Sequence, residues 1–174
     1  EHGMKDYEVQ FTGLNNGIHT FDFEVGEKFF DYYGESDLVD NEIVSGDLKL
    51  LLSMDKKETM LVFDFEIEGA VKVLCAKCSE EMGISISSKR RVIGKFSDEE
   101  TWHEDEIIHI PSSVHKIDLK DLIFQFVVLE IPMRTIHPKG GCNPEMIKEI
   151  EKRSYQYEEK EETDPRWDAL KNLK

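Results

Sequence analysis

Apolar and polar residues alternate along most of the chain up to residue 96, which is the pattern of half-buried β-strands. The turn signal Asn15-Asn16-Gly17 separates the first two alternating segments, so these two are predicted to form an antiparallel hairpin. Residues 27–33 break the alternation and predict a short helix or turn. The predicted strand segments are residues 7–11, 19–25, 44–54, 61–67, 71–75 and 82–96, with a short edge strand at 107–110.

The pattern changes to that of a helix after Asp118, which is the predicted N-cap. Apolar residues surround nearly all of residues 119–129, so this helix is predicted to pack deeply against the sheet and to end before Pro132. Asn143-Pro144 predicts the start of a charged helix that runs to about Tyr157. The predicted fold is α+β: a mainly antiparallel β-sheet or flattened barrel packed on one buried helix, with a charged C-terminal helix and tail.

Length and composition limit the class of protein. The chain has 174 residues, of which 39% are hydrophobic, so one self-supporting core is expected. The longest apolar run, near residues 122–131, is too short and too polar to span a membrane, and no secretory leader follows Met4. We therefore expect a cytoplasmic protein. The expected organisation is a single α+β domain over residues 4–142, followed by a charged helix, polar linker and docking segment over 143–174.

Three cysteines are too few for a disulfide framework in a chain of this length, which favours reduced thiols or metal ligands. Cys75 and Cys78 form a C-x-x-C pair at a predicted strand-to-strand connection, the spacing with which two thiolates bind Zn²⁺. His137 and Cys142, in a Pro/Gly-bearing loop, are the best sources of two further ligands and would complete a structural Cys₃His zinc site. The alternative is a chance C-x-x-C with Cys142 as a lone thiol. A thioredoxin-type site is disfavoured, because strand pattern continues on both sides of the pair.

Enzymatic motifs are missing from the sequence. There is neither a Gly-x-Ser-x-Gly motif nor a phosphate-cradling glycine loop, and His103, His109 and His115 lie near no evident nucleophile. We therefore predict a protein that is not an enzyme and has no small-molecule substrate.

The C-terminal eleven residues predict a short helix that must dock on something. An Asp-Pro start and apolar residues at helical spacing define it, but an isolated helix below about twelve residues is marginal in water. It either docks on this protein's own core or folds on a partner. The expected docking residues are Asp164, Pro165, Arg166, Trp167, Leu170 and Leu173.

Three motifs, taken in order, resemble the YceD-like family of large ribosomal RNA subunit accumulation proteins. They are the C-x-x-C at Cys75 and Cys78; Ile117-Asp118-Leu119 leading through the apolar helix to Pro132, His137 and Cys142; and the closing Asp164-Pro165-Arg166-Trp167 with Leu170 and Leu173. The resemblance covers the chain from about residue 60 onward. It implies a non-enzymatic ribosome-biogenesis factor that promotes accumulation or processing of large-subunit (23S) ribosomal RNA.

The distribution of charge suggests two routes to such a role. The formal net charge is -15, which repels nucleic acid, but residues 69–95 carry six basic residues against two acidic ones. In the first route, basic residues gather around the cysteines and contact RNA phosphates. In the second, the acidic surface shields a basic large-subunit ribosomal protein. A third possibility is a metal-stabilised acidic protein–protein interaction module with no ribosomal role. The residues expected in the basic face are Lys72, Lys77, Lys89, Arg90, Arg91, Arg134 and Lys139.

Overall fold

The computed structural model describes residues 7–34, 43–97 and 107–154, and the chain divides into two compact units, residues 1–142 and 143–174. The described strands are β1 (Glu8–Gln10), β2 (Gly17–Val25), β3 (Ile43–Lys56), β4 (Met60–Leu74), β5 (Glu81–Phe96), β6 (Ile107–Ile110) and β7 (Lys116–Asp118). The described helices are α1 (Glu27–Gly34), α2 (Lys120–Glu130) and α3 (Pro144–Arg153), of which α3 belongs to the second unit.

The first unit is built on a five-stranded sheet with the order β2-β3-β4-β5-β6. All its neighbours are antiparallel except β5 and β6, which run parallel. In the described residues β2 and β6 are opposite edges of this sheet, so the sheet is open and does not close into a barrel. The predicted α+β class with a mainly antiparallel sheet is confirmed.

The alternation in the sequence decides which face of the sheet is buried, because successive side chains of a strand point to opposite faces. Even-numbered residues of β3 from Leu48 to Met54 and odd-numbered residues of β4 from Leu61 to Ile67 are buried, and the register Leu50↔Ile67 places them on one face. We call this face the inner face. The fully buried side chains that fill it include Leu48, Leu50, Leu52, Met54, Leu61, Phe63, Phe65 and Ile67.

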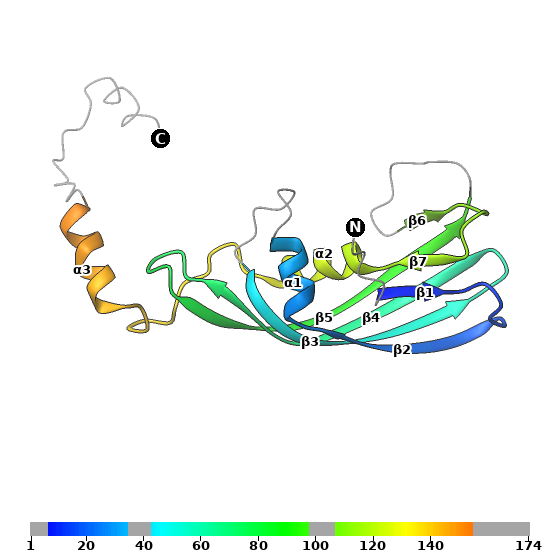
Figure 1. Cartoon of the computed structure of the whole chain (residues 1–174), viewed down its shortest axis with the longest axis horizontal. Coiled ribbons are helices and arrows are strands. Elements are labelled where there is room, and N and C mark those ends of the chain that lie inside the picture. Colours follow the sequence, from blue (N-terminus) through cyan, green and yellow to red (C-terminus); the bar gives the residue numbers. More distant parts are fainter. Residues whose placement is uncertain (1–6, 35–42, 98–106, 155–174) are drawn as a thin grey trace, which may run out of the picture. The chain divides into compact units, whose positions relative to one another are not determined.

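Both helices of the first unit cover the inner face. Figure 1 shows α1, α2 and the β1–β7 pair on the same side of the sheet, while no described element of this unit covers the other side, the outer face. The ring of Tyr33 on α1 stacks on Phe124 of α2 at 4.0 Å, and Phe126 meets Phe65 of β4 at 5.2 Å. The predicted deep packing of α2 is confirmed on one side, but Leu129 near its end is 67% exposed.

Polar side chains mark the starts of two helices. Leu119 occupies the N-cap position of α2, and the carboxylate of the predicted cap Asp118 accepts a hydrogen bond from the backbone N–H of Lys120 at 3.0 Å. In the second unit, the Asn143 side chain caps α3 by accepting from the N–H groups of Glu145 and Met146. The Asn-Pro start of α3 is therefore confirmed.

The predicted hairpin between the first two strand segments is wrong. β1 pairs with β7 in a separate two-stranded sheet, and β2 pairs with β3. The long strand β3 offers β2 nine paired positions, whereas β1 is only three residues long. In addition, the Lys56 ammonium binds the backbone carbonyls of Phe11 and Leu14, which satisfies the connection between β1 and β2 without a hairpin.

Candidate metal centre and charged surfaces

Cys75 and Cys78 lie in the tight connection between β4 and β5, which we call the cysteine knuckle (residues 75–80). The N–H of Cys75 donates to the carbonyl of Glu80 at 2.9 Å, and the N–H of Ser79 donates to the carbonyl of Cys75 at 2.8 Å. Ser79 adopts a left-handed conformation with φ of 58°, which turns the chain back into β5. Both cysteine side chains are buried as a result.

The second pair of candidate ligands comes from the loop between α2 and α3 (residues 131–143), which returns to the end of β4. Thr135 is buried there and fixes the loop: its carbonyl accepts from the N–H of Ala76 at 2.7 Å, and its hydroxyl donates to the carbonyl of Leu74 at 3.0 Å. These bonds place His137 and Cys142 next to the cysteine knuckle.

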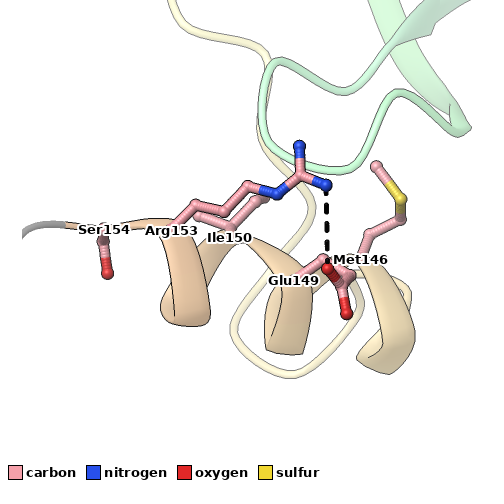
Figure 2. Close-up of a pocket in the computed structure, with 5 residues that line it drawn as sticks. All are labelled: Met146, Glu149, Ile150, Arg153 and Ser154. Atoms are coloured by element: carbon pink, nitrogen blue, oxygen red, sulfur yellow. Dashed lines mark ion pairs between the residues drawn. The ribbon is translucent and has the colours of Figure 1, made fainter.

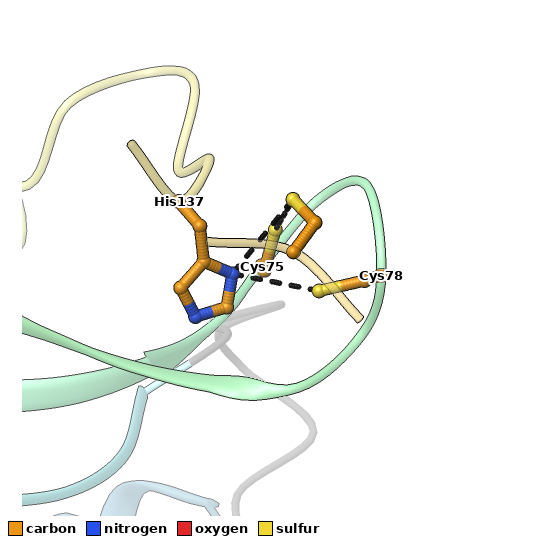
Figure 3. Close-up of side chains that lie close together, drawn as sticks. Cys75, Cys78 and His137 are labelled. Carbon is orange, nitrogen blue, oxygen red and sulfur yellow. Dashed lines mark hydrogen bonds between the residues drawn. The ribbon is translucent and has the colours of Figure 1, made fainter. Parts of the chain in front are cut away.

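The four predicted ligands meet in space and are positioned to hold a metal ion. The ligand atoms of Cys75, Cys78, His137 and Cys142 all lie within 4.8 Å of one another. The Sγ atoms of Cys75 and Cys142 are 3.9 Å apart, and Sγ of Cys78 is 3.4 Å from Nδ1 of His137. Sulfur ligands of tetrahedral Zn²⁺ lie about 3.8 Å apart, because each Zn–S bond is about 2.3 Å long. Figure 3 shows the side chains of Cys75, Cys78 and His137 turned toward one another.

The orientation of His137 suits metal binding. Its Nδ1 faces the sulfur atoms, while Nε2 lies 3.3 Å from the backbone carbonyl of Glu81. Metal-bound histidines usually donate their second ring N–H to such an acceptor, which fixes the ring and the tautomer. The carbonyl of Glu81 therefore supports the site from outside the ligand set.

The electrostatics of the site favour a thiolate at Cys75. Burial would raise its pKa, but the backbone N–H groups of His137, Cys78 and Lys77 and the thiol of Cys78 together lower the pKa to about 5. Burial and hydrogen bonding to the other two cysteines raise the pKa of Cys142 to about 11. The hydrogen bond with Cys75 raises the pKa of His137 against the effect of burial. A bound cation would take the place of the protons that these groups otherwise share.

Three residues of the predicted basic face lie far from the cysteine knuckle, and the expectation that they gather around it is wrong. Lys89, Arg90 and Arg91 lie opposite residues 64–66 of β4. Eight or more strand positions separate them from Leu74, or about 25 Å at the usual rise per residue. The predicted gathering failed because β5 continues in regular pairing with β4 and carries these residues away from the turn.

These three cations are also neutralised. On the outer face, Lys89 binds Glu66 at 2.8 Å, and the Arg91 guanidinium binds both carboxylate oxygens of Asp64 at 2.6 and 3.0 Å. Arg90 points to the opposite side of β5 and binds Glu130 at the end of α2 at 2.8 Å. Because a nearby carboxylate offsets its charge, each of these cations attracts a phosphate only weakly.

The remaining basic residues lie at the cysteine knuckle or in the α2–α3 loop. Lys72 is close to the end of β4 and pairs with Glu81 at 3.5 Å. Lys77, Arg134 and Lys139 have no ion pair with another described residue. The predicted face is thus reduced to these three exposed cations plus Lys72.

The acidic partners Asp64, Glu66 and Glu130 were missed by sequence reasoning, although part of the signal was present. If residues are counted along both strands from the turn between Leu74 and Glu81, Asp64 falls opposite Arg91 and Glu66 falls opposite Lys89. The partner of Arg90 had no such signal, because α2 reaches it from a distant part of the chain.

In the second unit, α3 buries none of its residues. One side of the helix lines a pocket, shown in Figure 2, where the Arg153 guanidinium lies 3.9 Å from the Glu149 carboxylate. The lining residues are Met146, Glu149, Ile150, Arg153 and Ser154. The predicted docking residues Asp164, Pro165, Arg166, Trp167, Leu170 and Leu173 lie outside the described residues, so their docking stays a prediction.

Comparison with known proteins points to one family. The family model described as "Large ribosomal RNA subunit accumulation protein YceD" matches residues 63–174, which include all four candidate ligands. No curated protein and no solved structure matches the chain. Among the described helices, none has the length and apolar character that crossing a membrane requires.

Proposed function

The chain belongs to the YceD family, and we propose that it is a non-enzymatic factor that promotes accumulation or processing of large-subunit ribosomal RNA. We further propose that it does so mainly by shielding a basic large-subunit ribosomal protein. One observation carries this choice of route: Lys89, Arg90 and Arg91, the densest basic run of the sequence, are neutralised by carboxylates of the same chain. Because these cations form ion pairs within the chain, the protein presents an acidic surface to its partner.

The outer face of the sheet supplies that acidic surface. Asp22 and Glu24 of β2, Asp47 of β3 and Glu68 of β4 lie there, and no ion pair joins any of them to another described residue. Lys49 lies directly opposite both Glu24 and Glu68 in the register and offsets one charge. An anionic face of this kind attracts a cationic protein and repels free RNA, so it would protect the protein until it meets its RNA site.

We propose that the metal is zinc and that its role is structural. Three thiolates and one imidazole complete a tetrahedral set and leave no position open for a water or substrate. The ion would join the tip of the β4–β5 hairpin to the α2–α3 loop and add to the hydrogen bonds that Thr135 makes between them. Structural zinc sites contribute on the order of 10 kcal/mol to folding, which is comparable to the whole stability of a domain.

Direct RNA contact is the second candidate, and the cations of the cysteine knuckle and the α2–α3 loop favour it. Lys77, Arg134 and Lys139 are exposed, and the proposed metal would fix the two segments that carry them. Three phosphate contacts give a slope of log affinity against log salt of only about -2 to -3. This face would therefore orient the protein on RNA without supplying strong binding.

The proposed function is tested in cells that lack the gene and carry the chain on a plasmid. We expect the chain to restore the ratio of large-subunit to small-subunit ribosomal RNA and to sediment with large-subunit precursors. A variant that neutralises the four outer-face acids together (Asp22→Asn, Glu24→Gln, Asp47→Asn and Glu68→Gln) should reduce both effects. The reduction should be larger than that caused by Lys77→Ala with Lys139→Ala. If the ratio is the same with and without the gene, the chain is a metal-stabilised interaction module with no ribosomal role.

A further inference from the structure

β2 is a long strand with one open edge. It is nine residues long and stands first in the sheet order, so no described strand pairs with the side that faces away from β3. An open edge presents unpaired N–H and C=O groups, which are a template for pairing with another extended chain.

The direction of the backbone groups can be read from one contact. The hydroxyl of Tyr7 donates to the carbonyl of Glu24 at 2.8 Å, so this carbonyl is reached from outside the β2–β3 ladder. In an antiparallel pair, alternate residues turn both backbone groups to the same side. Thr20 and Asp22 therefore direct their N–H and C=O groups to the open edge, while Tyr7 occupies the edge at Glu24.

Side chains beside this edge define the chemistry of an added strand. On the outer face, Asp22 and Glu24 are exposed and have no ion pair with another described residue. On the inner face, Phe21 and Phe23 are half-buried and pack against the core. Because side chains of an added strand alternate between the same two faces, lysine or arginine would lie next to the acids and apolar residues next to the phenylalanines.

We propose that the edge of β2 binds an extended cationic segment of a basic protein by strand addition. This inference rests on the proposed shielding function and names the strand edge at which the basic protein would bind and the extended conformation it would adopt. A second copy of this chain is a poorer occupant, since pairing two β2 edges brings Asp22 and Glu24 near their own copies, and like charges destabilise such pairs. RNA is a still poorer occupant, because the carboxylates of Asp22 and Glu24 would repel its phosphates.

The test uses the full chain and a nine-residue fluorescent peptide in which lysine alternates with valine. Thr20→Pro removes one N–H from the open edge, where proline is tolerated because that N–H has no partner in the sheet. We expect Thr20→Pro to weaken peptide binding by about tenfold or more, which is a free-energy change of about 1.4 kcal/mol. The matched control Thr20→Val keeps the N–H and should change the affinity by less than about twofold.

A pair of charge variants separates edge binding from general attraction to an acidic protein. Asp22→Asn with Glu24→Gln removes two charges at the edge, and Asp47→Asn with Glu68→Gln removes two charges elsewhere on the outer face. The first pair should weaken binding and flatten its salt dependence, while the second should have a smaller effect. Equal effects of the two pairs would overturn strand addition.

Amide hydrogen exchange gives a readout that does not depend on whether Thr20→Pro folds. On peptide binding to the unmodified chain, the N–H groups of Thr20 and Asp22 should become protected, and those of Phe21 and Phe23, already paired with β3, should change little. The inference is overturned if the amides of Thr20 and Asp22 stay unprotected, or if a folded Thr20→Pro variant binds the peptide with full affinity. It is also overturned if the unmodified chain forms a dimer and Thr20→Pro abolishes that dimer. The peptide assay contains no RNA, so an unchanged ribosomal RNA ratio in cells overturns the proposed function without altering this result.

Discussion

The four side chains of the candidate metal centre come in two pairs from the cysteine knuckle and the α2–α3 loop, so removing one ligand should release the ion and loosen both segments. We expect His137→Ala and Cys75→Ser each to reduce the zinc content of the purified protein from about one ion per chain to near zero. Elemental analysis of protein prepared without chelator measures the content. The melting temperature should also fall by about 10 °C or more, as it should when a chelator removes the ion from the unmodified chain.

An exposed histidine elsewhere in the first unit provides the control. Among the described residues, the His115 ring lies within hydrogen-bond distance of the Thr12 hydroxyl, and its backbone carbonyl accepts from Thr12 and from the N–H of Phe11, contacts that an alanine would keep. His115→Ala should keep the zinc content and change the melting temperature by only a few degrees. The unmodified protein is also refolded and purified in a buffer that contains zinc. If it then holds no zinc, the four residues form only a cluster of thiols and an imidazole.

Glu130 makes stability depend on pH through one carboxylate. It accepts hydrogen bonds from Ser88 at 2.9 Å and from Arg90 at 2.8 Å, and these two contacts lower its pKa in the folded protein. A lowered pKa adds stability above the unfolded value near 4.3, and this stability is lost as the pH falls through the folded value. Glu130→Gln should therefore cost about 1 kcal/mol at pH 7 and almost nothing below the folded pKa.

Denaturant titrations of Glu130→Gln and the unmodified chain at several pH values measure this difference. Glu68→Gln, an outer-face change without an ion-pair partner among the described residues, serves as the control and should show a much smaller cost at pH 7. A cost for Glu130→Gln that stays constant from pH 7 down to pH 3 would contradict the role of the carboxylate charge.

At the level of strands, the long β3–β4 pair depends on a glycine. Gly69 has φ of 148°, and a Cβ there would collide with the backbone carbonyl of Asp47 on β3. Backbone cannot move away as a flexible side chain can, so Gly69→Ala should destabilise the protein by about 2–4 kcal/mol. Gly83 on β5 has open space around the position of a Cβ, so Gly83→Ala should change the stability by less than about 1 kcal/mol. Equal destabilisation by the two variants, measured by chemical unfolding, would contradict the steric cause.

Local patterns predicted the elements of this fold but not all of their partners. The alternation of apolar residues identified β2 to β5 and the inner face, because burial on one side of a sheet imposes that period. The partner of β1 could not be found in the same way. Its alternation suits any partner, and β7 is separated from it by about a hundred residues along the chain.

The candidate site shows the same division between local and distant information. Cys75 and Cys78 were predictable as a pair because a strand connection fixes their spacing, and the loop glycines drew attention to His137 and Cys142. What brings the two pairs together is the contact of Thr135 with the end of β4. Backbone hydrogen bonds of this kind leave no signature in residue types, so the proximity itself required the structure.

Across the described residues, most of the positive charge of residues 69–95 is paired with carboxylates of the same chain. Lys72, Lys89, Arg90 and Arg91 are held by carboxylates, so the sign reversal seen along the sequence does not produce an equally basic surface. Exposed ion pairs of this type each contribute little to stability, typically below about 1 kcal/mol. Their larger effect is on the surface potential, because every internal pair removes one cation from possible contact with phosphate.

This distribution predicts how two charge-reversal variants will differ in RNA binding. Arg90→Glu with Arg91→Glu should change the affinity for a large-subunit RNA fragment by less than about threefold and leave the salt slope unchanged, because neither arginine offers a free charge. Lys77→Glu with Lys139→Glu alters the same number of charges in the cysteine knuckle and the α2–α3 loop, where no described carboxylate pairs with either lysine. It should weaken RNA binding at low salt and reduce the salt slope by about 2. Gel shifts over a salt titration compare the two variants. A larger loss with the arginine pair would mean that those residues leave Glu130 and Asp64 to contact RNA, and would restore the wider basic face.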